Sequence, residues 1–211
     1  MKADLTMNLV MLDDGRPLII AREAVGVARS ENVIRDLVFA NPAMLSVAAI
    51  DPGFGPLVSV ARELNVPGVG RIDALLVDHR GRLVIVEAKL WRNPQARREV
   101  VGQILDYARA LARWTYEDLQ REVSSATKRH GNVLFDLVRE AGGESDEARF
   151  VDQVSRDLHA GRFLLLIVGD GITEGTQRIG EFLADHGGLA FDFGLIEVAQ
   201  YCFHDSRLGC E

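Results

Sequence analysis

Two apolar runs joined by a short polar turn form the stretch GRIDALLVDHRGRLVIVEAKLW in the middle of the chain. Unbroken apolar runs of this length are typical of strands buried on both faces. The turn between them predicts an antiparallel pair of strands near 71–78 and 82–89. Buried strands seldom keep charged residues, so Asp73, Glu87 and Lys89 within this pair call for a physical explanation.

Around this pair, segments with strand and helix patterns alternate along the chain, which predicts an α/β or mixed α+β class. The expected elements are a hairpin at 8–20 turning at Asp-Asp-Gly, a helix from Ser30 to Asn41-Pro42, a strand at 56–66, a helix from Asn93-Pro94 to about 120, a helical stretch at 117–160 broken by the loop AGGESDEA, a buried strand at 163–168, a helix near 173–186, and strands in LAFDF and LIEVAQYCF. We divide the chain into an N-terminal hairpin and linker, 1–29, and one domain, 30–211, with a helical insertion at about 117–160.

The composition narrows the class of protein further. A length of 211 residues suits one domain with an appendage, and 47% hydrophobic residues are enough to bury a core. The sequence has no apolar run of the length that crosses a bilayer, and its start lacks the layout of a signal peptide. The two cysteines, Cys202 and Cys210, do not form a disulfide scaffold, so we expect a cytoplasmic protein.

Charge is unevenly distributed. The chain has 24 basic and 31 acidic residues, a net charge of −7, so any nucleic-acid binding has to use a local basic face. Such a face is available at 89–113, where basic residues outnumber acidic ones. Arg97 and Arg98, early in the expected helix, and Arg71 before the first apolar run are the candidates for phosphate contacts. A solvated helix face is the alternative for the arginines.

Strand geometry brings the buried charges together. Side chains alternate faces along a strand, so Glu87 and Lys89 share one face. In an antiparallel hairpin the start of one strand lies beside the end of the other, which places Asp73 near both. Two carboxylates at that spacing repel each other, and burial raises the cost. Lys89 supplies one positive charge, and a hard divalent cation held by carboxylates supplies more. A plain structural ion-pair cluster is the alternative.

These residues also resemble a known motif. Asp73, followed 14 positions later by Glu87 in a Glu-x-Lys that ends an apolar strand, resembles the PD-(D/E)XK nuclease superfamily. In the following helix, Gln103 and Tyr107 of QILDY resemble the Gln-x-x-x-Tyr element of RecB-like nucleases, and the layout is similar to the nuclease domain of NucS/EndoMS mismatch endonucleases. Ile72 stands where the nominal motif has proline. The resemblance covers about 30–107 and, weakly, 160–170.

The resemblance implies a restriction-endonuclease-like core, in which helices flank a mixed central sheet, and hydrolysis of phosphodiester bonds in nucleic acid, with DNA favoured. It implies Mg²⁺ or Mn²⁺ as the cofactor. By this resemblance Asp73, Glu87 and the Ala88 carbonyl are metal ligands, Lys89 serves the attacking water, and Gln103 positions water or substrate. A homodimer is compatible with this assignment, and a membrane partner is not expected.

Two further residues have an accessory role by the same resemblance. Glu31 occupies a place where many members carry an additional acid, although an acid in the first turn also favours the helix dipole. Tyr107 lies one turn beyond Gln103 on the same helical face, where a core aromatic is the alternative.

Two other functions compete with the nuclease. One is a non-catalytic, nuclease-fold domain that binds nucleic acid or acts as a scaffold. The other is a dinucleotide site, because Gly169, Gly171 and Gly175 form a loose GxGxxxG after a strand, and we expect Asp192 to end a later strand. The glycine spacing differs from the GxGxxG fingerprint, so this is the weaker of the two.

Overall fold

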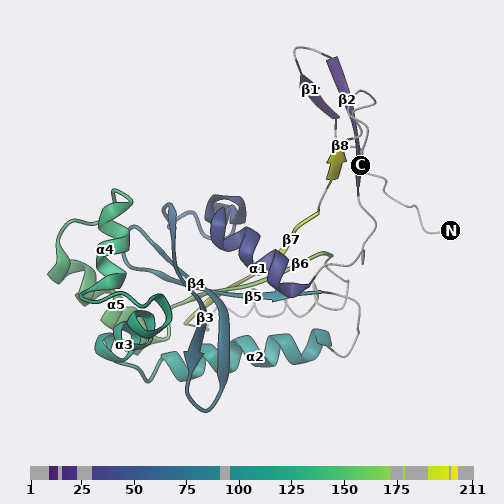
Figure 1. Ribbon diagram of the computed structural model, residues 1–211. Coiled ribbons are helices and arrows are strands. Elements are labelled where there is room, and N and C mark those ends of the chain that lie inside the picture. The colour runs from purple at the N-terminus through teal and green to yellow at the C-terminus, as the bar shows by residue number, and fades with distance from the viewer. Residues whose placement is uncertain are drawn as a thin grey trace.

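The computed structural model is an α/β protein in which helices flank an open, mixed sheet of five strands (Figure 1). The backbone is described for residues 10–13, 16–22, 30–90, 96–171, 178, 190–199 and 201–203, and side chains for 30–90, 99–171, 178 and 190–199. No helix within these residues is long and apolar enough to cross a membrane. The expected helix near 173–186 lies almost wholly outside the described residues.

The central sheet has the strand order β3-β4-β5-β6-β7. Its strands are β3 (Leu57–Val66), β4 (Gly70–Asp78), β5 (Leu83–Lys89), β6 (Leu164–Gly169) and β7 (Asp192–Glu197). The first three form an antiparallel meander, and β6 and β7 continue the sheet parallel to β5. The expected hairpin of β4 and β5 is confirmed, and so is the buried strand at 163–168, because every residue of β6 is buried.

The end of the chain differs from the expectation. Gly194, which the sequence suggested as a break between two strands, lies inside β7. A Cβ atom at this position would lie 2.5 Å from Ile50 Cδ1 and 2.9 Å from a Leu166 methyl group. Glycine is therefore used for close packing here rather than for a turn. The last expected strand is also wrong, since β8 (Tyr201–Phe203) is separate from β7.

A second sheet joins the two ends of the chain. The expected N-terminal hairpin is confirmed as β1 (Val10–Asp13) and β2 (Arg16–Arg22), which pair antiparallel with Asp13 opposite Arg16. β8 pairs antiparallel with β2 and completes a three-stranded sheet of order β1-β2-β8. The β1–β2 hairpin is therefore part of a sheet that also contains β8, a strand from much later in the sequence.

One face of the central sheet is covered by α1 (Glu31–Ala40), followed by the short 3-10 helices η1 (Pro42–Leu45) and η2 (Val47–Ala49). Ile34 and Val38 bury the apolar side of α1, whereas Val33 is 45% exposed. The helix ends at Asn41, as expected. Ser30 stands at the N-cap position without a side-chain capping bond.

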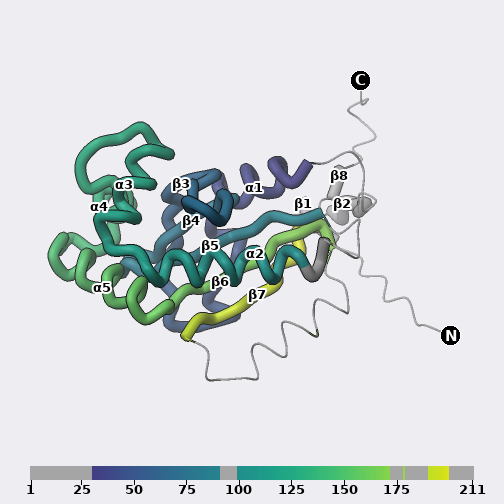
Figure 2. The backbone as a smooth tube through the Cα atoms, turned by 90° about the horizontal axis from the view of Figure 1, so that it is seen from below, coloured from purple at the N-terminus to yellow at the C-terminus, as the bar shows by residue number. Residues whose placement is uncertain are grey.

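The other face is covered by α2 (Ala96–Leu111), which runs along β5 and β6 (Figure 2). The insertion adds α3 (Tyr116–Thr127), α4 (Val133–Glu140) and α5 (Glu147–Ala160). The expected single helix to about 120 is wrong. A new helix starts after Thr115, whose side chain accepts the Asp118 N–H while the Asp118 carboxylate accepts the Thr115 N–H. This capping box stabilises a new helix start.

Strand alternation separates the core into two layers. Leu83 and Ile85 of β5 pack toward α2 and the insertion, whereas Val84 and Val86 pack toward α1. Because β5 lies between two strands and between two helical layers, its apolar residues are completely buried. Charged groups at its end therefore lie next to low-dielectric surroundings.

Candidate active site

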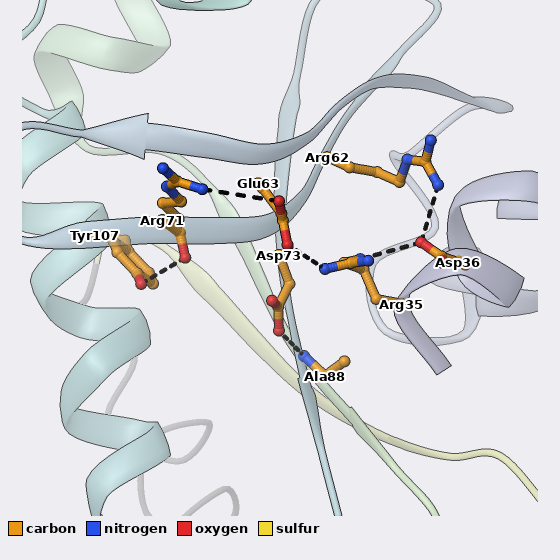
Figure 3. Close-up of polar contacts among 8 residues, drawn as sticks. All are labelled: Arg35, Asp36, Arg62, Glu63, Arg71, Asp73, Ala88 and Tyr107. Atoms are coloured by element: carbon orange, nitrogen blue, oxygen red, sulfur yellow. Dashed lines mark hydrogen bonds and ion pairs between the residues drawn. The ribbon is translucent and has the colours of Figure 1, made fainter. Parts of the chain in front are cut away.

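The charged residues meet at the end of the central strands. In the β4–β5 pair, Ala74 lies opposite Val86, and one further step along the same register sets Asp73 against Glu87. Asp73 Oδ2 accepts a hydrogen bond of 2.8 Å from the Ala88 backbone N–H (Figure 3). β4 and β5 are interior strands. The site therefore lies at the ends of two interior strands and not on an edge strand.

Glu87 is the most constrained of these groups. Glu87 is only 4% exposed, and its Oε2 is buried with no hydrogen-bond partner among the described residues. Burial, and then repulsion from the Asp73 carboxylate, raise the pKa of Glu87 to about 8, with Lys89 acting in the opposite direction. A buried carboxylate oxygen without a donor is costly, so this atom is suited to a cation or a proton.

Asp73 has a milder but similar environment. Burial raises its pKa, while the hydrogen bond from Ala88 and the charges of Arg35 and Lys89 lower it. Glu31 raises it by charge repulsion. The two strand carboxylates therefore interact with each other and with the same surrounding charges, as groups sharing a site do.

Helix α1 contributes Glu31 to the site. Its Oε1 lies 3.0 Å from Lys89 Nζ and accepts a longer hydrogen bond of 3.3 Å from the Leu90 backbone N–H. Glu31 is thus more than an acid at a helix start, because it anchors the lysine and the end of β5. Lys89 leans toward α1 in this arrangement, although strand alternation alone groups it with Glu87.

Helix α2 reaches the site through a short hydrogen-bond chain. Gln103 Nε2 donates to the Tyr107 hydroxyl at 3.0 Å, and that hydroxyl donates to the Arg71 carbonyl oxygen at 2.6 Å. Tyr107 is buried in the core, and a Cβ atom at Gly70 would lie 2.9 Å from its hydroxyl oxygen. Tyr107 therefore combines both sequence interpretations, as a core aromatic that ties α2 to the backbone just before Asp73.

We expect Tyr107→Phe to destabilise the protein by about 1–2 kcal/mol, because the Arg71 carbonyl and the Gln103 amide lose their partner. Tyr116→Phe is the matched control, since its hydroxyl donates to Asn132 in the insertion. Urea unfolding measures the stability of both variants, and amide exchange of Ala88 measures the effect on the site. Only Tyr107→Phe should speed exchange at Ala88, and an equal effect of the two variants would contradict this coupling.

Three residues of the neighbourhood were not anticipated. Arg35, one helical turn after Glu31, is largely buried, and its Nη1 lies 2.6 Å from Glu63 Oε1 (Figure 3). Its Nε also lies 3.1 Å from Asp36 Oδ1. The spacing of four residues from Glu31 was a signal that both face the same way. The rest depends on β3, which is distant in sequence.

Glu63 has an unusual backbone. Its φ of 49° is in the left-handed region, which non-glycine residues rarely adopt, and it lies on β3 between Arg62 and Leu64, which pair with Ala74 and Ile72. The residue is therefore adjacent to Asp73 in the sheet. Rare backbone conformations cluster at functional sites, and this one directs the Glu63 carboxylate toward Arg35.

The arginines expected to contact nucleic acid have different outcomes. The Arg71 side chain is 69% exposed and lies 3.9 Å from Glu63, so it is accessible and only loosely paired. Arg97 and Arg98 lie in the first turn of α2, but their side chains are outside the described residues.

The oxygen atoms at this site limit which metal ions it could hold. Within the described parts of the chain, no three His, Cys, Asp or Glu side chains gather into a metal-binding group. Asp73 and Glu87 with the Ala88 carbonyl are a smaller set, of the kind that holds Mg²⁺ together with water and phosphate oxygens. The unpartnered Glu87 Oε2 fits such a cation, because it is a buried anionic oxygen without a donor.

The positions of the glycines and Asp192 do not fit a dinucleotide-binding site. Gly169 ends β6, but Asp192 begins β7 and pairs with Leu164 at the start of β6. The acid is thus at the opposite end of the strands from Gly169 and Gly171, whereas a ribose-binding acid has to lie near the glycine turn. Gly175 lies outside the described residues.

Comparisons with known proteins give no assignment: no family model, no curated protein and no solved structure matches the chain. The fold and site define the chain as an α/β protein with a mixed sheet, in which a buried glutamate lies beside a half-buried aspartate at the end of the central strands. Any more specific function has to be argued from the site itself.

Proposed function

We propose that this protein is a metal-dependent nuclease of the PD-(D/E)XK type, with a restriction-endonuclease-like core, which hydrolyses phosphodiester bonds of DNA. The observation that carries the proposal is the buried Glu87 carboxyl group, with one oxygen unpartnered, held against Asp73 and close to Lys89. A purely structural group of charges is expected to satisfy its buried oxygens.

The arrangement of elements supports the same proposal. The motif residues occupy a strand–turn–strand–helix unit, β4, β5 and α2, and β6 extends it in parallel. Asp73 and Glu87 lie on the interior strands β4 and β5, whose backbones are hydrogen-bonded to a neighbouring strand on each side. Such rigidity keeps a constellation of charged groups in place for catalysis.

Each side chain has a role in the proposed reaction. Asp73 and Glu87, with the Ala88 carbonyl, would hold Mg²⁺ or Mn²⁺, which when bound lowers the pKa of water and stabilises charge on the phosphoryl oxygens. The Lys89 ammonium group orients the attacking water or stabilises the charge on the phosphate. Glu31, 3.0 Å from that nitrogen, keeps the ammonium group in position. Gln103 reaches the same end of the sheet through Tyr107.

The test is a cleavage assay on single-stranded, duplex and branched DNA, and on RNA, with Mg²⁺ and Mn²⁺. We expect Lys89→Ala to lower the cleavage rate by on the order of 10²-fold or more while nucleic-acid binding is retained. Arg121→Ala is the matched control, because it removes one positive charge from an exposed pair with Asp118 on α3, outside the basic face at 89–113. This control should cleave at the wild-type rate.

The same assay separates an enzyme from a non-catalytic binding domain. If the wild type binds nucleic acid but never cleaves it with either ion, and Lys89→Ala only lowers the melting temperature, the nuclease proposal fails. The non-catalytic interpretation then replaces it.

A further inference from the structure

A cavity of about 620 Å³ lies between α1, β3 and the region linking α3 to α4. Its charged wall is made of Arg35, Arg62 and Arg129, with Glu63 as the acid. Among the lining residues three positive charges face one negative charge, and Arg62 and Arg129 have further acidic partners, Asp36 and Glu140, outside the lining. A concave surface with such an excess attracts anions, and phosphate above all.

The cavity adjoins the candidate active site. Arg35 belongs to both, because it lines the cavity and lies one turn after Glu31 on α1. Glu63 also belongs to both, since it lies beside Asp73 in the sheet and accepts a hydrogen bond from Arg35 (Figure 3). A chain of nucleotides that places one phosphate at the carboxylates therefore has a second positive surface next to it.

The outer arginines have partners that a phosphate can replace. Arg62 lies 3.0 Å from Asp36, and Arg129 lies 2.9 Å from Glu140, all with well-exposed side chains. Exposed ion pairs contribute little to stability. A phosphate offers bidentate, charge-assisted hydrogen bonds to a guanidinium group, which are stronger.

Arg62 is held in place by packing against an aromatic ring. The Arg62 guanidinium carbon lies 5.2 Å from the centre of the Phe39 ring, a residue that also lines the cavity. A cation held over an aromatic ring loses less freedom on binding a ligand. The volume falls in the range of about 300–1,000 Å³ typical of small-molecule sites, which leaves room for a sugar beside the phosphate.

We propose that this cavity binds a backbone phosphate, with its flanking sugar, of the nucleic-acid strand that enters the active site. The inference rests on the proposed function for the identity of the ligand. It assigns strand binding to Arg62 and Arg129, and leaves the hydrolytic step to the residues at the end of β4 and β5.

The experiment compares Arg62→Ala/Arg129→Ala with Arg149→Ala/Arg156→Ala, which removes the same charge from α5, outside the cavity. Affinity for a fluorescein-labelled oligonucleotide is measured by anisotropy in EDTA over a series of KCl concentrations. We expect the cavity variant to lose on the order of tenfold or more in affinity, and its salt slope to fall by about 1, because one phosphate contact is lost. The α5 variant should match the wild type in both.

Cleavage at saturating substrate gives the second measurement, and the cavity variant should keep the wild-type rate. Equal losses in both variants, no loss in the cavity variant, or a wild type that does not bind the oligonucleotide overturns the inference. A wild type that binds but does not cleave, with binding lost only in the cavity variant, overturns the nuclease proposal and supports the cavity assignment. Circular dichroism checks folding, and Arg62→Gln/Arg129→Gln replaces the alanine pair if it fails to fold.

Discussion

Glu87→Gln should lower the hydrolysis rate by on the order of 10²–10³-fold and at the same time make the protein more stable at neutral pH. The loss of rate follows from losing one of two anionic ligands for the metal ion. The gain in stability follows from the burial of the carboxyl group, its unpartnered Oε2 and its repulsion by Asp73. A neutral amide of similar shape removes that repulsion.

The effect on stability depends on pH in a defined direction. The pKa of Glu87 is about 8 in the folded protein, compared with an ordinary value of 4.5. The folded state therefore binds a proton that the unfolded state has released in this window. As far as this group is concerned, the free energy of unfolding of the wild type is highest below about pH 4.5. It falls by on the order of a few kcal/mol as the pH rises to about 8. The amide side chain of the variant does not titrate, so the stability curve of the variant should be flatter.

Melting temperatures of the wild type and Glu87→Gln in EDTA between pH 5 and 9 measure this, together with cleavage rates in about 10 mM Mg²⁺, a hard cation of the kind the site fits. Addition of Mn²⁺ should stabilise the wild type more at pH 8 than at pH 6, because metal binding has to displace the proton. Glu87→Gln should show little response. A structural ion cluster predicts the reverse, since removing one partner of a buried pair costs about 3–5 kcal/mol.

Asp73→Asn should also lower hydrolysis by on the order of 10²–10³-fold, with the fold retained. The amide carbonyl oxygen of the variant side chain is still able to accept the hydrogen bond of the Ala88 N–H, which Asp73 Oδ2 accepts at 2.8 Å in the wild type. The negative charge is lost, and with it the second anionic ligand. Cleavage rate and urea unfolding, measured side by side, separate the chemical effect from the structural one.

Asp73→Asn provides a further check through its neighbour. The Asp73 charge is the second-largest cause of the raised Glu87 pKa, so its removal should bring that pKa down. The pH range over which stability falls should become narrower, with its upper limit below about 8. The double variant Asp73→Asn/Glu87→Gln should be scarcely slower than either single variant, because the two ligands act as a unit. Independent, multiplying losses would show that the carboxylates do not share a site.

Local pattern predicted much of what places this site. The two apolar runs at 71–78 and 82–89 and the turn between them were sufficient for the β4–β5 hairpin, and strand geometry then brought Asp73 to Glu87 and Lys89. The buried run at 163–168 was identified in the same way, because no polar residue interrupts it. Strands of this kind are revealed by the order of neighbouring residues, here an unbroken apolar run bounded by turn residues.

Contacts between distant segments decided the rest. In the sequence Gly194 suggests a strand break. In the structure Ile50, which is far away in sequence, occupies the space that a side chain at this position would need. Asp192 seemed to end a strand near the glycine turn, and the parallel register of β6 and β7 puts it at the other end. The sequence alone has no access to the register between two strands that are distant in sequence.

The same division holds for the chemistry of the site. The residue types at 73, 87 and 89 were determined by the sequence, and so was their common location at the end of two strands. The tertiary structure decided that Lys89 turns to Glu31, and that Arg35 lies beside Asp73 with Glu63 as its partner. It also decided that one oxygen of Glu87 is buried without a partner, because the pKa and the reactivity of a carboxyl group depend on what surrounds it in space.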